Sequence, residues 1–130
     1  METRMNKAEA TVLVVEDDAD TRETLGFVIR KEGHRVVCLR NGQEALDYLR
    51  RSPPPNLVLL DLTMPIMSGW QFLEERRNDP RLASVPVVVL SVAAGQDVLA
   101  LPGEVDLLLQ KPASLHSVLA VVEGYCDRNV

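Results

Sequence analysis

Charged and hydroxyl side chains follow four of the apolar runs in this sequence. They are Glu16 and Asp17 after the first run, Asp61 after the third, Ser91 after the fourth and Lys111 after the fifth. Clustered carboxylates repel one another, so at neutral pH such a group either holds a proton or binds a cation. Oxygen ligands without His or Cys favour Mg²⁺, which keeps several waters and readily shares a site with phosphate. The residue types therefore indicate a magnesium site that also handles a phosphoryl group.

Phosphoryl transfer has a use for each of these groups. A carboxylate beside Mg²⁺ can attack phosphorus and form an acyl phosphate. The metal neutralises charge on the transferring oxygens, a lysine adds a second positive charge, and a hydroxyl donates a hydrogen bond to a phosphoryl oxygen. Taken singly, each residue has a plainer role, because acidic residues often begin helices and Ser and Lys-Pro are common at turns and helix starts. Their coincidence at four strand ends favours one shared site.

Short apolar runs alternate with amphipathic segments along the chain, and the candidate site residues lie at the ends of these runs. The runs are four to six residues long and rich in Val and Leu; they cover 11–15, 36–39, 57–60, 85–90 and 105–109. Continuous apolarity of this length is typical of strands buried on both faces of a parallel sheet. The helix-like segments cover 20–32, 43–51, 69–77, 95–101 and 114–125, and Gly33 is a helix stop after the first of them.

Five β units alternating with five α units predict an α/β fold with helices on both faces of the sheet. Right-handed crossovers restrict the topology, and we expect a doubly wound, five-stranded parallel sheet of (βα)5 type in the flavodoxin-like order 2-1-3-4-5. In such sheets ligands bind beyond the carboxyl ends of the strands, where the order reverses. The five polar residues fall at those ends.

Composition bounds the remaining possibilities. The 130 residues suit one domain, and 46% apolar with 25% charged residues is ordinary for a globular protein. We expect residues 1–10 to be a flexible N-terminal tail and residues 11–127 to form the domain. No apolar run approaches a membrane span or a signal peptide, so the expected location is cytoplasmic, with no membrane partner. The net charge of −5 without a basic stripe argues against direct nucleic-acid binding.

Four segments closely resemble the receiver domain of two-component response regulators: VLVVEDDADTRETL, LVLLDLTMPIMSGWQFL, VPVVVLS and LLLQKP. The resemblance covers about residues 11–125, and its most specific part is Asp61-x-x-Met64-Pro65-x-Met67-x-Gly69. The intervals also fit, with 44 residues from Asp17 to Asp61, 30 to Ser91 and 20 more to Lys111.

The resemblance implies a role for each site residue. Asp61 would be the phosphoacceptor, and Mg²⁺ would be held by Asp17 directly, by Glu16 through water, by Asp61 and by the backbone carbonyl of Thr63. Gly69 would shape the loop after the third strand through a positive φ or a close approach.

The hydroxyl of Ser91 would follow the phosphoryl group, and Lys111 would be its ion partner. The peptide bond between Lys111 and Pro112 is expected to be cis. Two departures from the family pattern, Leu108 where an aromatic residue is usual and Val92 where Ala is usual, predict an atypical conformational response to phosphorylation.

The resemblance further implies a signalling module and not a turnover enzyme. It would take a phosphoryl group from a sensor histidine kinase or a histidine phosphotransfer protein and act on a downstream protein, as a monomer or weak dimer. Because the sequence stops at Val130, soon after the last expected helix, we expect no output domain. The main alternative is a degenerate receiver that serves as a phosphorylation-independent scaffold.

Two further alternatives have specific requirements. A phosphohydrolase with Asp61 as nucleophile is expected to carry a second Asp two residues on, where Thr63 stands. A flavin-binding domain of the same topology needs a Ser-, Thr- or Gly-rich loop after the first strand, where Glu16 and two aspartates stand.

Overall fold

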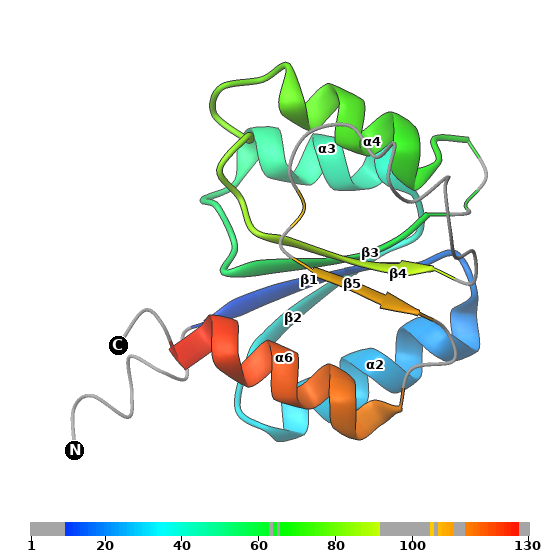
Figure 1. Ribbon diagram of the computed structural model, residues 1–130, viewed down its shortest axis with the longest axis vertical. Helices are drawn as coiled ribbons and strands as arrows, with labels where there is room; N and C mark the ends of the chain where they lie inside the picture. Colours follow the sequence, from blue (N-terminus) through cyan, green and yellow to red (C-terminus); the bar gives the residue numbers. More distant parts are fainter. Residues whose placement is uncertain are drawn as a thin grey trace.

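The computed structural model of the protein describes residues 10–62, 64, 66–91, 105, 107–110 and 114–127. These residues form three layers, with a parallel sheet between two pairs of helices (Figure 1). Helices α3 (Gly42–Arg51) and α4 (Gly69–Arg77) cover one face, and α2 (Ala19–Lys31) and α6 (Leu115–Asp127) cover the other.

The strands pair in the order β2-β1-β3-β4-β5, and every described pairing is parallel. They are β1 (Thr11–Val15), β2 (Arg35–Leu39), β3 (Leu57–Asp61), β4 (Val87–Ser91) and β5 (Leu107–Gln110). In β1 and β3, Val15 lies opposite Leu60. The next residues, Glu16 and Asp61, therefore lie at the same level of the sheet.

Continuous apolarity in the strands matches their burial on both faces. All five residues of β3 are buried, as are four of the five in β1. Side chains of alternating orientation enter two separate cores: Leu13 and Val15 face α3 and α4, whereas Val12 and Val14 face α2 and α6.

Short polar side chains begin three of the helices. Asp18 accepts a hydrogen bond from the Thr21 N–H at 2.9 Å, and Asn41 caps α3 in the same way. Ser68 and Gln71 form a capping box at the start of α4. After α2 the predicted stop is confirmed, because Gly33 has a φ of 97° that a residue with a side chain rarely adopts.

The prediction of a flavodoxin-like α/β fold is confirmed. The predicted fourth helix, 95–101, lies outside the described residues, so the complete (βα)5 repeat stays a prediction. Strand β4 begins at Val87 and not at the predicted position 85. Pro86 has no N–H for the ladder, and the carbonyl of Val85 accepts hydrogen bonds from the buried Arg76 at 2.7 and 3.2 Å.

The packed region begins one residue before the predicted domain boundary. Ala10 is buried at the end of the core beneath α2 and α6, and its carbonyl accepts the N–H of Arg35 at 2.8 Å. The rest of the predicted tail, 1–9, lies outside the described residues. Among the described helices, none is both long and apolar enough to cross a bilayer.

Candidate metal and phosphoryl site

Three carboxylates meet where β1 and β3 end. Glu16 and Asp17 directly follow β1, and Asp61 is the last residue of β3. Each offers one carboxylate oxygen, and these oxygens all lie within 4.8 Å of one another. The parallel register of β1 and β3 explains the meeting, since it places residues separated by about 45 positions in the chain side by side.

Two of these carboxylates are removed from solvent. Glu16 is 2% exposed and Asp61 6% exposed, whereas Asp17 is exposed. One carboxylate oxygen of Glu16 accepts the Asp18 N–H at 3.2 Å, which orients it within the loop. Like charges this close destabilise one another. A set of three hard oxygen ligands with no His or Cys fits a divalent cation such as Mg²⁺ or Mn²⁺.

An arginine in the first turn of α2 forms hydrogen bonds with the loop that carries Glu16 and Asp17. The Arg22 guanidinium donates to the carbonyl of Glu16 at 2.9 Å and to that of Asp17 at 3.3 Å. Charge-assisted hydrogen bonds to two successive carbonyls restrict the path of this loop. Sequence reasoning missed Arg22; its place five residues after Asp17, one helical turn beyond the cap, was the available signal.

Replacing Arg22 with methionine is expected to lower the free energy of unfolding by about 1–2 kcal/mol. Methionine keeps most of the apolar stem, so the loss comes from the two carbonyl contacts. Urea denaturation followed by circular dichroism measures it. Arg77→Met is the control, because Arg77 forms an exposed pair with Glu74 and its loss should cost under about 1 kcal/mol. Equal midpoints for the two variants would contradict the bracing role.

Two backbone hydrogen bonds hold the segment that leads from the end of β3 to the start of α4. Gly69 donates its N–H to the Leu62 carbonyl at 2.9 Å, and Gly42 donates to the Met67 carbonyl at 3.1 Å. A Cβ on Gly69 would lie 2.6 Å from the Asp61 carbonyl oxygen. The predicted close approach at Gly69 is therefore confirmed. The alternative reason for a glycine here, a positive φ, is not found at Gly69; in this segment Ile66 has one, at 69°.

The other predicted site residues are placed only in part. The backbone of Ser91 ends β4 one position beyond Leu90, which lies opposite Asp61. Thr63, Val92 and the bond between Lys111 and Pro112 lie outside the described residues. Leu108 belongs to β5, opposite Val89. The metal-binding, hydroxyl and ion-pair roles of these residues stay predictions.

Comparisons with known proteins agree with the geometry. The profile of the family described as the response regulator receiver domain matches residues 12–123. The response regulator Rcp1 of Synechocystis sp. is 31% identical over 134 residues, which cover 95% of this chain and 90% of Rcp1.

Solved structures of the same family superpose well. The phosphorylated cyanobacterial phytochrome response regulator RcpA has a TM-score of 0.76 at 31% identity, with 89% of this chain and 90% of that chain covered. The Mn²⁺-bound form of Rcp1 has a TM-score of 0.72 at 31% identity, with 88% and 90% covered. With its parallel sheet and its acidic group at the ends of β1 and β3, the chain belongs to the response regulator receiver domain family of two-component systems.

Proposed function

We propose that this protein accepts a phosphoryl group on Asp61 in a reaction that requires Mg²⁺. The donor is the phosphohistidine of a sensor histidine kinase or a histidine phosphotransfer protein. The phosphorylated form then acts through contacts with a downstream protein, and the chain is a signalling module and not a turnover enzyme.

One observation carries the proposal: the carboxylate of Asp61 lies within 4.8 Å of two further carboxylates at the end of a buried strand. Such a group attracts a divalent cation, and the cation allows a dianionic phosphoryl group to approach an acidic site. The names of the relatives point the same way, since RcpA is described as phosphorylated and Rcp1 as Mn²⁺-bound.

The residues divide the chemistry between them. Glu16, Asp17, Asp61 and the carbonyl of Thr63 would hold Mg²⁺, which when bound neutralises charge on the phosphoryl oxygens. A carboxylate oxygen of Asp61 attacks phosphorus, the phosphorus–nitrogen bond of the donor breaks, and the imidazole leaves with the electron pair.

Two more residues would contact the transferred group. We propose that the hydroxyl of Ser91 donates to one phosphoryl oxygen and that the Lys111 ammonium pairs with another. Asp61 as a residue is only 6% exposed, so its side chain is largely shielded from water before the donor arrives.

Intact mass after incubation with acetyl phosphate tests the proposal. We expect the protein to gain the mass of one phosphoryl group with Mg²⁺ and to gain none when EDTA is present. Asp61→Asn should gain none under either condition, because an amide oxygen is a far weaker nucleophile and loses one negative charge of the metal site. An equal adduct on Asp61→Asn refutes the assignment of Asp61. No adduct on the wild type, in spite of metal binding, favours the phosphorylation-independent scaffold.

A further inference from the structure

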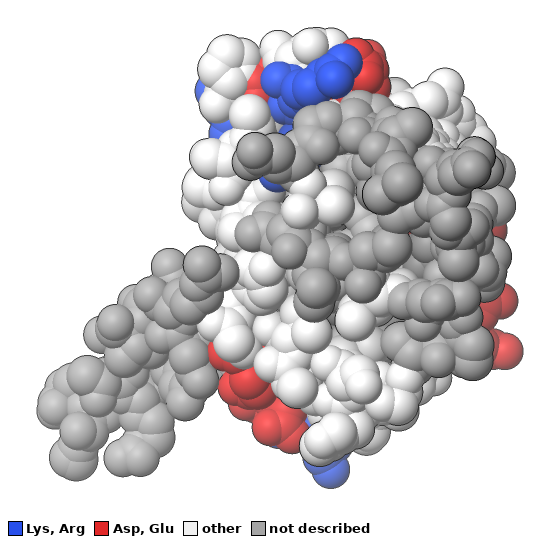
Figure 2. All heavy atoms as spheres, in the orientation of Figure 1, with Lys and Arg blue, Asp and Glu red and all other residues white. Residues whose placement is uncertain are grey.

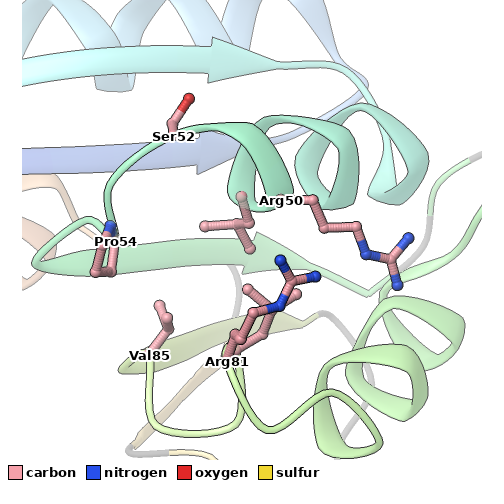
Figure 3. Close-up of a pocket in the computed structure, with 7 residues that line it drawn as sticks. Arg50, Ser52, Pro54, Arg81 and Val85 are labelled. Carbon is pink, nitrogen blue, oxygen red and sulfur yellow. The ribbon is translucent and has the colours of Figure 1, made fainter.

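A cleft of about 210 Å³ lies at the end of the molecule opposite the acidic group (Figure 3). It is bounded by the last residues of α3, the segment that leads into β3 and the loop that follows α4. Val85 precedes β4 by two residues and Pro54 precedes β3 by three, so the cleft lies at the amino ends of these strands. Asp61 lies at the carboxyl end of β3, a full strand length away, and the cleft is no part of the phosphoryl site.

The floor of the cleft is apolar. Leu49, Leu82 and Val85 line it, and each is also a member of the core between the sheet and α3 and α4. Their side chains are anchored in that core, so the floor is preformed. The volume is below the roughly 300–1,000 Å³ of typical cofactor pockets. It therefore suits one apolar side chain better than a nucleotide or a flavin.

Two guanidinium groups stand at the edge of this floor and converge on one carboxylate. Arg81 donates to Asp79 at 3.1 and 3.3 Å, which helps hold the pKa of that carboxyl below its usual range. The Arg50 guanidinium lies 3.6 Å from the same Asp79 carboxylate and 3.6 Å from the carboxylate of Glu75. Figure 3 shows Arg50 and Arg81 extending from separate elements toward the same side of the cleft.

Arg50 has donors to spare. At 3.6 Å its two ion pairs are too long to be hydrogen bonds, and its guanidinium donates no hydrogen bond to any residue in the described part of the chain. Its pair with Glu75 joins two side chains that are 38% and 54% exposed, and such pairs contribute little. An incoming carboxylate can therefore bind Arg50 in the bidentate geometry that guanidinium groups favour.

Two carboxylates, those of Asp79 and Glu75, face the two arginines at the edge of the cleft, but only Arg81 is hydrogen-bonded to one of them. Arg50 is therefore the group at this edge that can bind an incoming carboxylate. Figure 2 shows basic and acidic side chains side by side at the end of the molecule near α4. Protein–protein interfaces have an apolar centre and are enriched in arginine, and this cleft combines an apolar floor with arginine at its edge.

We propose that this cleft binds an acidic peptide segment of a partner protein, with an apolar side chain on the floor and an adjacent Asp or Glu paired with Arg50. The cleft shares no residue with the acidic group, so the peptide binds without contact with the phosphoryl site. It gives the domain a second contact surface, at the opposite end of the sheet.

Amide spectra of the full ¹⁵N-labelled chain test the proposal, with the blocked peptide Gly-Glu-Leu-Asp-Gly as the probe. We expect saturable shifts centred on Leu49, Arg50, Ser52 and Leu82, with a dissociation constant of about 0.1–1 mM. Arg50→Gln should weaken binding about five-fold. Arg77→Gln is the matched control, since Arg77 pairs with Glu74 and does not line the cleft; it should change binding less than about two-fold. The spectra also report whether each variant remains folded.

Two further probes separate the apolar and the charged contributions. Gly-Gln-Leu-Asn-Gly lacks the charges and Gly-Glu-Gly-Asp-Gly lacks the apolar side chain, and both should bind more weakly. Equal binding of either peptide, equal weakening by Arg77→Gln, or no saturable shift with the first peptide overturns the proposal. The same shifts with inorganic phosphate alone also overturn it, because they show a small-anion site without a peptide requirement.

Discussion

Replacing Gly69 with alanine is expected to lower the free energy of unfolding by about 2–4 kcal/mol. The added Cβ would lie 2.6 Å from the Asp61 carbonyl oxygen and 2.7 Å from the Leu62 Cα, and both are backbone atoms that cannot rotate away. Helix α4 must then retreat from the end of β3, which stretches the hydrogen bond from Gly69 to Leu62. The helix propensity of alanine contributes only about 1 kcal/mol in the opposite direction.

Gly124→Ala is the matched control for this prediction. Gly124 also lies in a helix, but a Cβ there would meet no heavy atom within 4 Å. It should raise the free energy of unfolding by about 0.5–1 kcal/mol. Urea denaturation of both variants measures the difference. If Gly69→Ala is as stable as the wild type while Gly124→Ala is stabilised, the approach of α4 to β3 does not constrain this position.

Asp17→Asn is expected to weaken the binding of a divalent cation by about ten-fold or more. The side chain is exposed, so the substitution leaves no buried amide, and it removes one of the three carboxylates that lie within 4.8 Å of one another. Mn²⁺ is a suitable probe, because electron paramagnetic resonance measures the free ion directly. In the metal-free protein the same change removes repulsion between like charges. The urea midpoint without metal should therefore stay the same or rise.

Asp18→Asn makes the same change in charge one residue further along the chain. Asp18 caps α2 by accepting from the N–H and hydroxyl of Thr21 at 2.9 and 2.7 Å, and asparagine is an equally good cap. Its effect on Mn²⁺ affinity should be limited to about two-fold, since the charge it removes is screened by solvent. Equal losses in the two variants would mean that overall charge, and not ligation by Asp17, governs affinity.

Much of the fold was predictable because its strands are buried on both faces and its helices carry local start and stop signals. The strand at 11–15 and the helix at 69–77 were predicted with the observed limits. The start of β4 was not, because the apolar residue Val85 continues the strand pattern although its carbonyl is bound by Arg76 from α4. That contact joins residues nine positions apart through a turn, and the pattern of apolar residues alone does not indicate it.

Which chemical groups are present, and where each lies along its strand, follows from the order of the residues alone. Continuous apolar runs ending in Glu16, Asp17 and Asp61 indicated an acidic site, because parallel strands present their carboxyl ends at one edge of the sheet. Which atoms meet depends on how the strands and helices pack. The pairing of Val15 with Leu60 brings Glu16 level with Asp61, the turn of α2 brings Arg22 back to the loop, and two separate elements bring Arg50 and Arg81 to Asp79. These distances depend on strand register and helix packing, which are set by contacts between segments far apart in the chain and leave no local pattern in the sequence.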